Sequence, residues 1–478
     1  MSRSNMEILH VSAECYPVAK AGGLGDVAGA LPLYLNQAGH SARLVMPMYR
    51  TKFLYTHQWE VAHKGYASLG NRQFDFTVIR EADRSLGFDL YLLDINGLLD
   101  REKIYGYDDD TERFTAFQIA VLEWVSAWER KPDLIHVHDY HTALIPFMAT
   151  NCYRYSALQS LPTVLTIHNA EYQGWMGWDK SIYIPEWDTW NWGKLDWNNC
   201  INPLASGIKC ASAVTTVSPN YLQELKYKSN GLEALFEYEK GKCTGILNGI
   251  DSHVWDPQTD PFVQYNYGVE DAEAGKAKNK MQLCDRFNLD FEKPLISFIG
   301  RLVGEKGADL LPAAVADSFR YIGRRMNFII LGSGNTWVEN ALQKLTDQSN
   351  SDYNAYIGYD EGLSHQIYAG ADFLLMPSRV EPCGLNQLYS MRYGTVPMVR
   401  RTGGLKDTVI DYGDENGYGI CFEHAATGDI CQAIWRAAEL YRDKKKMFAI
   451  RKQMMQLDFD WKTSVKKYIE LYERVAFG

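Results

Sequence analysis

The stretch that decides the fold is ILHVSAECYPVAKAGGLGDVAGALP, residues 8–32. It opens with an apolar run at 8–13, which predicts a buried β-strand, and it ends in a segment that predicts a helix. Between the two, three glycines lie within four positions, flanked by Lys20 and Asp26. Strand, glycine-rich turn and helix in this order form the unit from which doubly wound parallel sheets are built.

The same alternation runs along the whole chain and lapses only in the polar stretch 255–293. Helical spacing of apolar residues marks 113–129, 272–287 and 458–477. We therefore predict an α/β protein with two Rossmann-like, doubly wound parallel-sheet domains, 1–252 and 253–457, and a last helix within 458–478. Further apolar runs predict strands at 42–47, 74–79, 89–94, 134–138, 163–168, 213–217, 295–299, 327–331, 355–359, 373–377 and 395–399.

Composition narrows the class of protein. The chain has 478 residues, of which 46% are hydrophobic and 23% charged, with a net charge of −10. This is the balance of a globular protein without a basic field for nucleic acid. No apolar run is long enough for a bilayer, and the N-terminal stretch lacks the apolar region of a secretory signal. Nine scattered cysteines without C-x-x-C predict a reduced, cytoplasmic protein. The sequence indicates no oligomeric state.

The turn after the first strand is a candidate ligand site. In open parallel sheets, ligands bind beyond the carboxyl ends of the strands. Gly22 and Gly23 would let backbone amides approach a ligand, the following helix start favours an anion, and Lys20 could meet a phosphate. The alternative is a tight turn with a surface lysine. The spacing fits neither standard nucleotide-binding motif.

Histidines follow two other strands. In IHVHDYH (135–141), His136 and His138 share one strand face, so a metal site is one interpretation. No fourth ligand stands at metal spacing, and a polar wall for sugar hydroxyls or a buried structural set are the alternatives. His168 ends another strand in TIHN, where a lone histidine is more often structural. An aromatic segment that begins at Tyr172 suits sugar rings, or the core of an insert.

The second half carries cations and a carboxylate at its strand ends. GRLVGEKG places Arg301 and Lys306 in one turn, and a guanidinium with an ammonium suits a diphosphate. In SRVEPCGLNQLYSMRYG, Glu381 would accept hydrogen bonds from a sugar, and we predict a helix that begins within two residues of Pro382, with the proline at its first position. Ordinary surface charges are the alternative. RTGGL (401–405) repeats the glycine turn.

Together these motifs resemble the bacterial glycogen synthase and plant starch synthase family. KAGGLGDV, IHVHDYH, TIHN, TTVSPNY, GILNGID, GRLVGEKG, EPCGLNQLYSMRYG and RRTGGLKDTV occur in the family's order. The family consists of retaining glucosyltransferases with the GT-B fold. The resemblance thus implies two facing domains with a cleft between them, the first on the acceptor side and the second on the nucleotide-sugar side, and a C-terminal helix that crosses back. Ala21, Tyr140 and Glu305 depart from the family pattern without removing a charge.

The resemblance implies transfer of glucose from ADP-glucose to the end of an α-1,4-glucan such as glycogen, with no cofactor and no metal. Alternatives are UDP-glucose or another acceptor, a non-catalytic glucan-binding protein, and a phosphorylase, for which no pyridoxal phosphate motif is recognisable. An Asp108–Asp110 cluster resembles a D-x-D metal motif, but a solvated loop is the simpler interpretation. The implied catalytic residues are Lys20, His168, Arg301, Lys306 and Glu381; the donor-binding residues are Gly22, Gly23, Asp139, Asn248, Gly300, Cys383, Gly384, Leu385, Thr402, Gly403 and Gly404; the acceptor-binding residues are Asp26, His141 and Tyr172.

Overall fold

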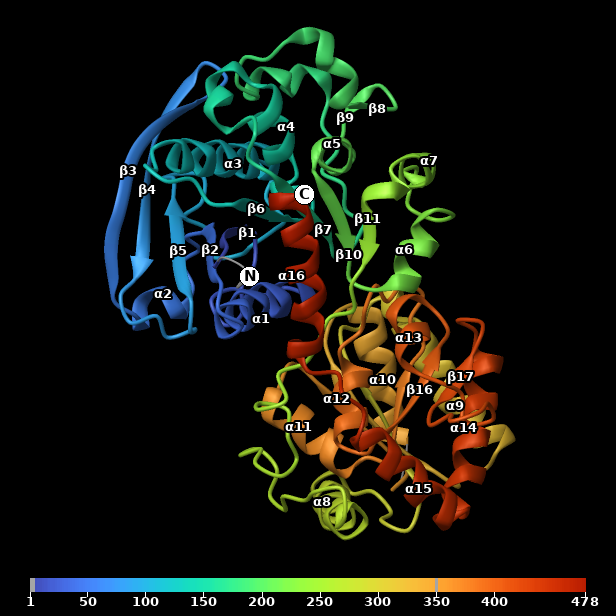
Figure 1. Cartoon of the computed structure of the whole chain (residues 1–478). Helices are drawn as coiled ribbons and strands as arrows, with labels where there is room; N and C mark the ends of the chain where they lie inside the picture. The colour runs from blue at the N-terminus through green and yellow to red at the C-terminus, as the bar shows by residue number, and fades with distance from the viewer. Residues whose placement is uncertain (1–4, 349–350) are drawn as a thin grey trace. The chain divides into compact units, whose positions relative to one another are not determined.

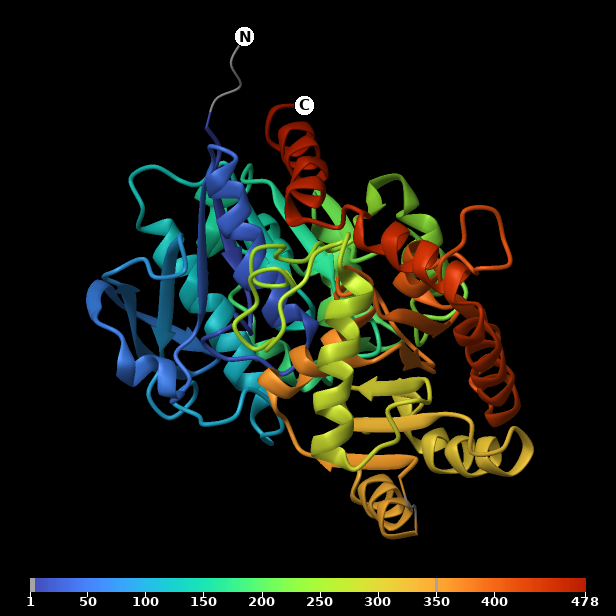
Figure 2. The same ribbon diagram turned by 90° about the horizontal axis from the view of Figure 1, so that it is seen from below.

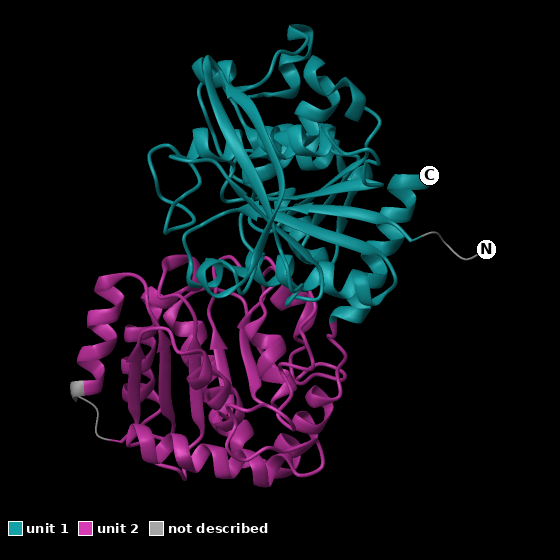
Figure 3. Ribbon diagram, turned by 90° about the vertical axis from the view of Figure 1, so that its left-hand side faces the viewer, with its two compact units in different colours: residues 1–247, 461–478 teal, residues 248–460 magenta. Residues whose placement is uncertain are grey.

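The computed structural model describes residues 5–348 and 351–478. The chain divides into two compact units (Figure 3): unit 1 comprises residues 1–247 and 461–478, and unit 2 comprises residues 248–460. Each unit is an α/β body built around its own sheet, which confirms the predicted fold class.

Unit 1 contains a sheet of nine strands in the order β11-β10-β7-β6-β1-β2-β5-β4-β3. The pairs from β11 to β5 are parallel, whereas β4 pairs antiparallel with both β5 and β3. The strands are β1 (Glu7–Val11), β2 (Ser41–Pro47), β3 (Trp59–Leu69), β4 (Arg72–Glu81), β5 (Asp89–Asp94), β6 (Leu134–His138), β7 (Thr163–Ile167), β10 (Ala213–Thr216) and β11 (Cys243–Gly245). The sequence did not predict β3, because most of its side chains are exposed and it has no sustained apolar run.

Unit 2 contains six strands, all parallel, in the order β14-β13-β12-β15-β16-β17. They are β12 (Leu295–Ile299), β13 (Asn327–Gly332), β14 (Tyr353–Ile357), β15 (Phe373–Met376), β16 (Val396–Arg400) and β17 (Ile420–Phe422). In both units the chain winds outward from a central strand and then returns to its other side. The winding therefore reverses between β1 and β6 in unit 1 and between β12 and β15 in unit 2, where parallel sheets open a crevice for ligands.

Helices cover both sheets, and most of them form the long crossovers that parallel strand pairs need. In unit 1 these are α1 (Gly23–Gln37), α2 (Lys52–Thr56), α3 (Asp110–Ser126), α4 (Leu144–Asn151), α5 (Pro203–Cys210), α6 (Pro219–Leu225) and α7 (Glu233–Tyr238). In unit 2 they are α8 (Ala272–Phe287), α9 (Leu311–Tyr321), α10 (Thr336–Gln348), α11 (Glu361–Gly370), α12 (Asn386–Arg392), α13 (Gly403–Thr408), α14 (Thr427–Arg442) and α15 (Lys444–Met455).

The last helix, α16 (Trp461–Phe477), belongs to unit 1 although the chain reaches it from unit 2. It lies along α1 in both views (Figures 1 and 2), and the rings of Trp461 and Tyr34 lie 6.4 Å apart. Tyr468 and Tyr472 are buried in the same apolar cluster as Ile8 of β1. The helix thereby completes the hydrophobic core beside the central strand.

One predicted helix start is wrong. α12 begins at Asn386, four residues after Pro382, so the proline does not occupy the first helical position. Gly384 has φ 73°, a left-handed conformation that interrupts a helical path. The side chain of Gln387 then donates hydrogen bonds to the carbonyl oxygens of Cys383 and Gly384 at 3.1 and 3.0 Å, which fixes this irregular turn.

Within residues 5–348 and 351–478, every helix is too short or too polar to cross a membrane. The nine cysteines all lie in the described part of the chain as free thiols.

Candidate active site

The turn after β1 contains an exposed ion pair. The Lys20 ammonium lies 2.7 Å from a carboxylate oxygen of Asp26, in the first turn of α1. The Lys20 side chain keeps 38% of its surface exposed. An exposed pair contributes little to stability, so Lys20 remains able to exchange this carboxylate for another anion.

Glu14 organises the same turn and was missed by the sequence analysis. One of its carboxylate oxygens accepts hydrogen bonds from the backbone N–H groups of Ala21 and Gly22 at 2.7 and 3.0 Å. The other accepts from the hydroxyl of Tyr105 at 2.7 Å. Burial raises the pKa of Glu14 above its ordinary value. The signal available in the sequence was a carboxylate that directly follows a buried strand. Because Glu14 accepts the hydrogen bond of the Gly22 N–H, this group is already engaged.

The glycines of this turn and of the start of α1 are of two kinds: some are in close contact with neighbouring atoms, and others have open space beside them. A Cβ atom at Gly29 would lie 2.5 Å from the carbonyl oxygen of Tyr16, so packing requires glycine there. One at Gly25 would lie 3.0 Å from the Lys20 side chain, a tight contact with a movable group. At Gly22 and Gly23 an added Cβ would meet no described atom within 4 Å. Gly22 is also in an ordinary extended conformation. The chain's own packing therefore leaves space at Gly22 and Gly23.

Asp139 follows β6 in a strained backbone conformation, φ 56° and ψ −177°, which is nearly exclusive to glycine. Its carboxylate accepts hydrogen bonds from the backbone N–H groups of His168 at 2.7 Å and Asn169 at 3.4 Å. Burial raises the pKa of Asp139 to about 7. Backbone strain and a perturbed pKa are both typical of residues at functional sites.

Asp139 and His168 are thus brought together, whereas the predicted acceptor residues in this region are not. His141 is buried, and its ring stacks on Tyr105 at 4.7 Å between centroids. Burial lowers the pKa of His141 to about 3. Tyr172 lies on the surface of the loop after β7, with 56% of its area exposed.

Three histidines on β1 and β6 form the one group of potential metal ligands among the described residues. Ring nitrogens of His10, His136 and His138 lie within 4.8 Å of one another. Both nitrogens of His136 and of His138, however, already make hydrogen bonds, and so does Nδ1 of His10. The three rings are also partly stacked, with planes 26° apart for His136 and His138. Because a nitrogen lone pair lies in the ring plane, stacked rings do not point their lone pairs at one ion.

In unit 2, Glu381 lies at the centre of a compact polar cluster. One carboxylate oxygen lies 2.7 Å from the Lys306 ammonium, and the other accepts a hydrogen bond from the Ser378 hydroxyl at 2.9 Å. Glu381 is only 6% exposed. The carboxylate is therefore fixed and charge-compensated before any ligand arrives.

The loops that carry these side chains are joined through their backbones. The N–H of Arg379 donates to the carbonyl oxygen of Glu305 at 2.8 Å. A Cβ at Gly307 would lie 2.2 Å from the carbonyl oxygen of Pro377, so only glycine fits there. Arg301 is half-exposed and lies 3.6 Å from the Glu305 carboxylate, the residue that departs from the family pattern.

The glycines of the 401–405 turn pack against the Glu381 loop. Gly403 has φ 45°, and an added Cβ would lie 2.0 Å from the carbonyl oxygen of Glu381. The Gly404 N–H donates to the carbonyl oxygens of Glu381 and Pro382, at 3.1 Å each. These glycines therefore hold Glu381 in place, and the Gly404 N–H is not free for a phosphate. Thr402 is the buried residue before α13.

The other predicted donor-binding residues lie near the same turns. Gly300 has φ 155°, which favours glycine. Cys383 is buried, and burial raises its pKa to about 12, so its thiol stays protonated. Asn248 is buried at the start of unit 2. Leu385 directly precedes α12.

The Asp108–Asp110 cluster is largely engaged in ion pairs. Asp109 lies 2.8 Å from the Arg101 guanidinium. Asp110 pairs with the buried Arg113 and accepts from the backbone N–H of Gly106 at 2.9 Å. Two of the three carboxylates therefore bind arginine, which argues against a D-x-D metal site.

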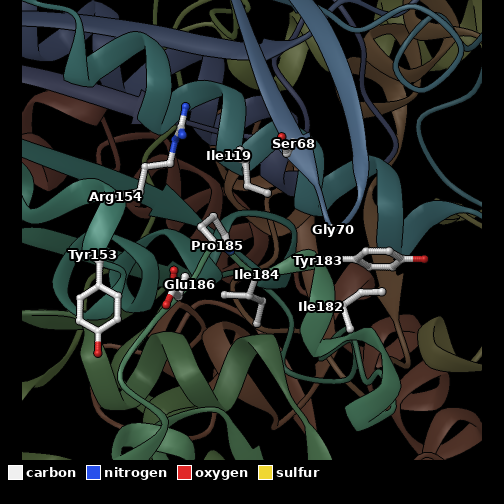
Figure 4. Close-up of a pocket in the computed structure, with 10 residues that line it drawn as sticks. All are labelled: Ser68, Gly70, Ile119, Tyr153, Arg154, Ile182, Tyr183, Ile184, Pro185 and Glu186. Carbon is white, nitrogen blue, oxygen red and sulfur yellow. The ribbon is translucent and has the colours of Figure 1, made fainter.

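A pocket of about 590 Å³ lies elsewhere in unit 1 (Figure 4). Of its lining side chains, Arg154 is bound by Glu123 at 2.9 Å. The predicted site residues gather at the carboxyl ends of the strands, and none of them lines this pocket. Its lining consists of Ser68, Gly70, Ile119, Tyr153, Arg154, Ile182, Tyr183, Ile184, Pro185 and Glu186.

Comparison with known proteins agrees with this geometry. Residues 7–238 match the family model "Starch synthase catalytic domain", and residues 283–453 match "Glycosyl transferases group 1". Two parallel-sheet α/β units with these matches define a glycosyltransferase of the GT-B fold.

The chain is 53% identical to the glycogen synthase of Flavobacterium johnsoniae over 470 residues, which cover 98% of this chain and 99% of the relative. It is 38% identical to a glycogen synthase of Streptococcus pneumoniae over 98% of its length and all of the relative's. The catalytic domain of starch synthase IV from Arabidopsis thaliana, solved with ADP and acarbose bound, superimposes with a TM-score of 0.90 at 31% identity and covers 99% of this chain and 100% of that one. The chain belongs to the glycogen synthase and starch synthase family.

Proposed function

We propose that this glycosyltransferase transfers glucose from ADP-glucose to the non-reducing-end 4-hydroxyl of an α-1,4-glucan, with retention of configuration. The observation that carries the proposal is the full-length likeness to a starch synthase that binds ADP and acarbose, together with the glycogen synthase relatives. Donor and acceptor are inferred from what those proteins bind and make.

The charges of the strand ends suit the chemistry of this transfer. Breaking the bond between glucose and the diphosphate leaves negative charge on the phosphate and positive charge on the anomeric carbon. In unit 2, Arg301 and Lys306 would stabilise the departing diphosphate, and in unit 1 Lys20 would act on the same charge. Glu381 would accept hydrogen bonds from the glucose hydroxyls.

The state of Glu381 supports a same-face displacement. A double displacement needs a free carboxylate nucleophile, with a second carboxyl about 5 Å away. Both carboxylate oxygens of Glu381 are instead bound, by Lys306 and Ser378. We therefore propose that the acceptor hydroxyl attacks on the face from which the phosphate departs, and that a phosphate oxygen receives its proton. The backbone carbonyl of His168 would stabilise the positive anomeric carbon.

A donor panel tests the proposal. ADP-, UDP- and GDP-glucose are supplied with glycogen, nucleotide release is measured, and the new linkage is identified by digestion with an α-1,4-specific hydrolase. We expect ADP-glucose to give the highest kcat/KM and a product that the hydrolase degrades fully. A higher kcat/KM with UDP-glucose would replace the proposed donor, and an undigested linkage would replace the proposed acceptor or stereochemistry.

A further inference from the structure

Three buried histidines of unit 1 form a continuous hydrogen-bonded chain that ends at the predicted site. Nδ1 of His10, on β1, lies 3.2 Å from Nε2 of His138, on β6. Nδ1 of His138 lies 3.0 Å from Nε2 of His168, which follows β7. The three strand ends are neighbours because β7, β6 and β1 are consecutive in the sheet. Nδ1 of His168 makes no hydrogen bond to a described residue and is the ring atom left for a ligand.

Each ring in this chain is neutral. Burial lowers the pKa of His10 and of His168 to about 3, and it holds the pKa of His138 well below its ordinary value. A neutral imidazole carries one N–H, and each contact between two rings needs one proton. The three rings must therefore all be Nδ1–H or all be Nε2–H, since a mixed chain would leave one contact with two protons or with none.

The environment of His10, at the other end of the hydrogen-bonded histidines, decides between the two tautomeric forms. Nε2 of His10 is buried and has no hydrogen-bond partner among the described residues. In the Nε2–H form it would be a buried N–H without an acceptor, which proteins rarely tolerate. In the Nδ1–H form it is only an unused lone pair.

We infer that His10 and His138 are positioning residues that hold the His168 ring as its Nδ1–H form, so that this N–H donates to a hydroxyl of the sugar substrate. The inference rests on the proposed function, in which His168 faces the transferred glucosyl group. Which nitrogen of a histidine carries the proton is set by the hydrogen bond at the other nitrogen, and the wrong tautomer disables a catalytic histidine.

A direct test reads the tautomers without measuring activity. The full-length protein is labelled with ¹⁵N-histidine, and the ring signals are assigned by their loss in His10→Asn, His138→Asn and His168→Gln variants. The expected result is Nδ1–H for His10, His138 and His168 at neutral pH. Nε2–H at His168 would overturn the inference, and so would metal in the purified protein, found by elemental analysis, together with metal-shifted ring nitrogens.

A pair of substitutions at His138 tests the functional consequence. The amide nitrogen of asparagine occupies the place of Nδ1, so His138→Asn keeps a donor toward His168. Glutamine reaches the place of Nε2, so His138→Gln keeps the contact with His10 and loses the one with His168. We expect His138→Gln to lower kcat by about tenfold to a hundredfold, with little change in the KM for ADP-glucose, and His138→Asn to retain most of kcat.

Equal kcat values for the two variants would overturn the positioning role, because each variant keeps one of the two hydrogen bonds of His138 and loses the other. Thermal unfolding of both variants shows whether they are folded. If the labelled protein contains Nδ1–H rings but transfers no glucose from ADP-glucose, the proposed function fails alone. If transfer proceeds and His168 is Nε2–H, this inference fails alone.

Discussion

Each cation predicted to meet a diphosphate is paired with a carboxylate in this structure. Lys20 is bound to Asp26 at 2.7 Å, and Lys306 is bound to Glu381 at the same distance. The two pairs differ in burial, because Glu381 is nearly inaccessible whereas Asp26 and Lys20 are partly exposed. A buried carboxylate that loses its cation is costly, so Lys306 stabilises the fold in addition to its proposed catalytic role.

The first prediction separates the stabilising role of Lys306 from its proposed catalytic role. Lys306→Ala leaves Glu381 bound to Ser378 alone, so we expect the free energy of unfolding to fall by about 1.5–3 kcal/mol. Turnover should fall by about 10²–10³, the usual cost of losing a donor to developing charge. Glu381→Gln alone should also lose most activity but keep the fold.

The double variant, Lys306→Ala with Glu381→Gln, is the control for this pair. It removes the uncompensated charge, so it should recover stability in chemical denaturation without recovering nucleotide release. Wild-type turnover in Lys306→Ala would contradict the catalytic role.

A second prediction concerns Asp139, whose pKa burial raises to about 7 from an ordinary value near 3.8. The folded protein then retains a proton that the unfolded chain loses, so the stabilising contribution of the protonated carboxyl is present at low pH and is lost as pH rises through 7. Asp139→Asn removes this dependence. The stability of the wild type relative to the variant should fall between pH 4 and pH 7, by at most about 1.4 kcal/mol per pH unit, and level off above pH 7. Thermal unfolding of both proteins measures it, and a constant difference across this range would contradict the shifted pKa.

At the scale of elements, α16 connects the end of the chain to the histidines of β6. The hydroxyl of Tyr472 lies 2.6 Å from Nδ1 of His136, and Nε2 of His136 lies 2.6 Å from the hydroxyl of Thr166 on β7. The ring of His136 stacks on His138 at 4.3 Å between centroids. The C-terminal helix α16 thus fixes His136, the ring that packs against His138.

The third prediction tests this support. Tyr472→Phe keeps the packing of α16 but leaves Nδ1 of the buried His136 without its partner. We expect the free energy of unfolding to fall by about 1–3 kcal/mol and amide hydrogen exchange in α16 to accelerate. Tyr238→Phe removes the hydroxyl of an 83% exposed tyrosine and should change neither quantity. Equal stability of the two variants would show that the contact with His136 contributes nothing.

At the scale of the whole molecule, the same winding pattern occurs twice, once in each unit, and each unit places its predicted residues at the carboxyl ends of central strands. Among the described residues, the one group of at least three potential metal ligands is the buried histidine cluster, whose nitrogens are mostly engaged.

The fourth prediction follows from this arrangement: transfer of glucose does not require a divalent metal. The side chains proposed to stabilise the diphosphate are lysines and an arginine, so a chelator such as EDTA should leave nucleotide release unchanged. The same assay with added Mg²⁺ is the control. Loss of activity in EDTA that Mg²⁺ restores would contradict the prediction and direct attention back to Asp108.

Much of the fold could be predicted from local patterns. The strand at 89–94 and the helix at 272–287 have the predicted bounds, because periodicity and flanking turns are properties of neighbouring residues. The β3 strand was missed because most of its side chains are exposed and it has no sustained apolar run. The start of α12 was misplaced because Pro382 precedes a left-handed Gly384. Glu14 was missed because its partners at 21 and 22 are revealed only when the turn folds back.

The sequence by itself determined the alternation of strands and helices, the glycine-rich turns after the strands, and which charged and polar side chains those turns carry. These features depend only on residues that are neighbours in the chain. Only the tertiary structure decided which glycines are required by packing, as Gly29 and Gly403 are, and which leave open space, as Gly22 does. It also decided that Lys306 binds Glu381, 75 residues away, and that His136 binds Tyr472, 336 residues away. Such partners depend on the order of strands in a sheet, which no local pattern specifies.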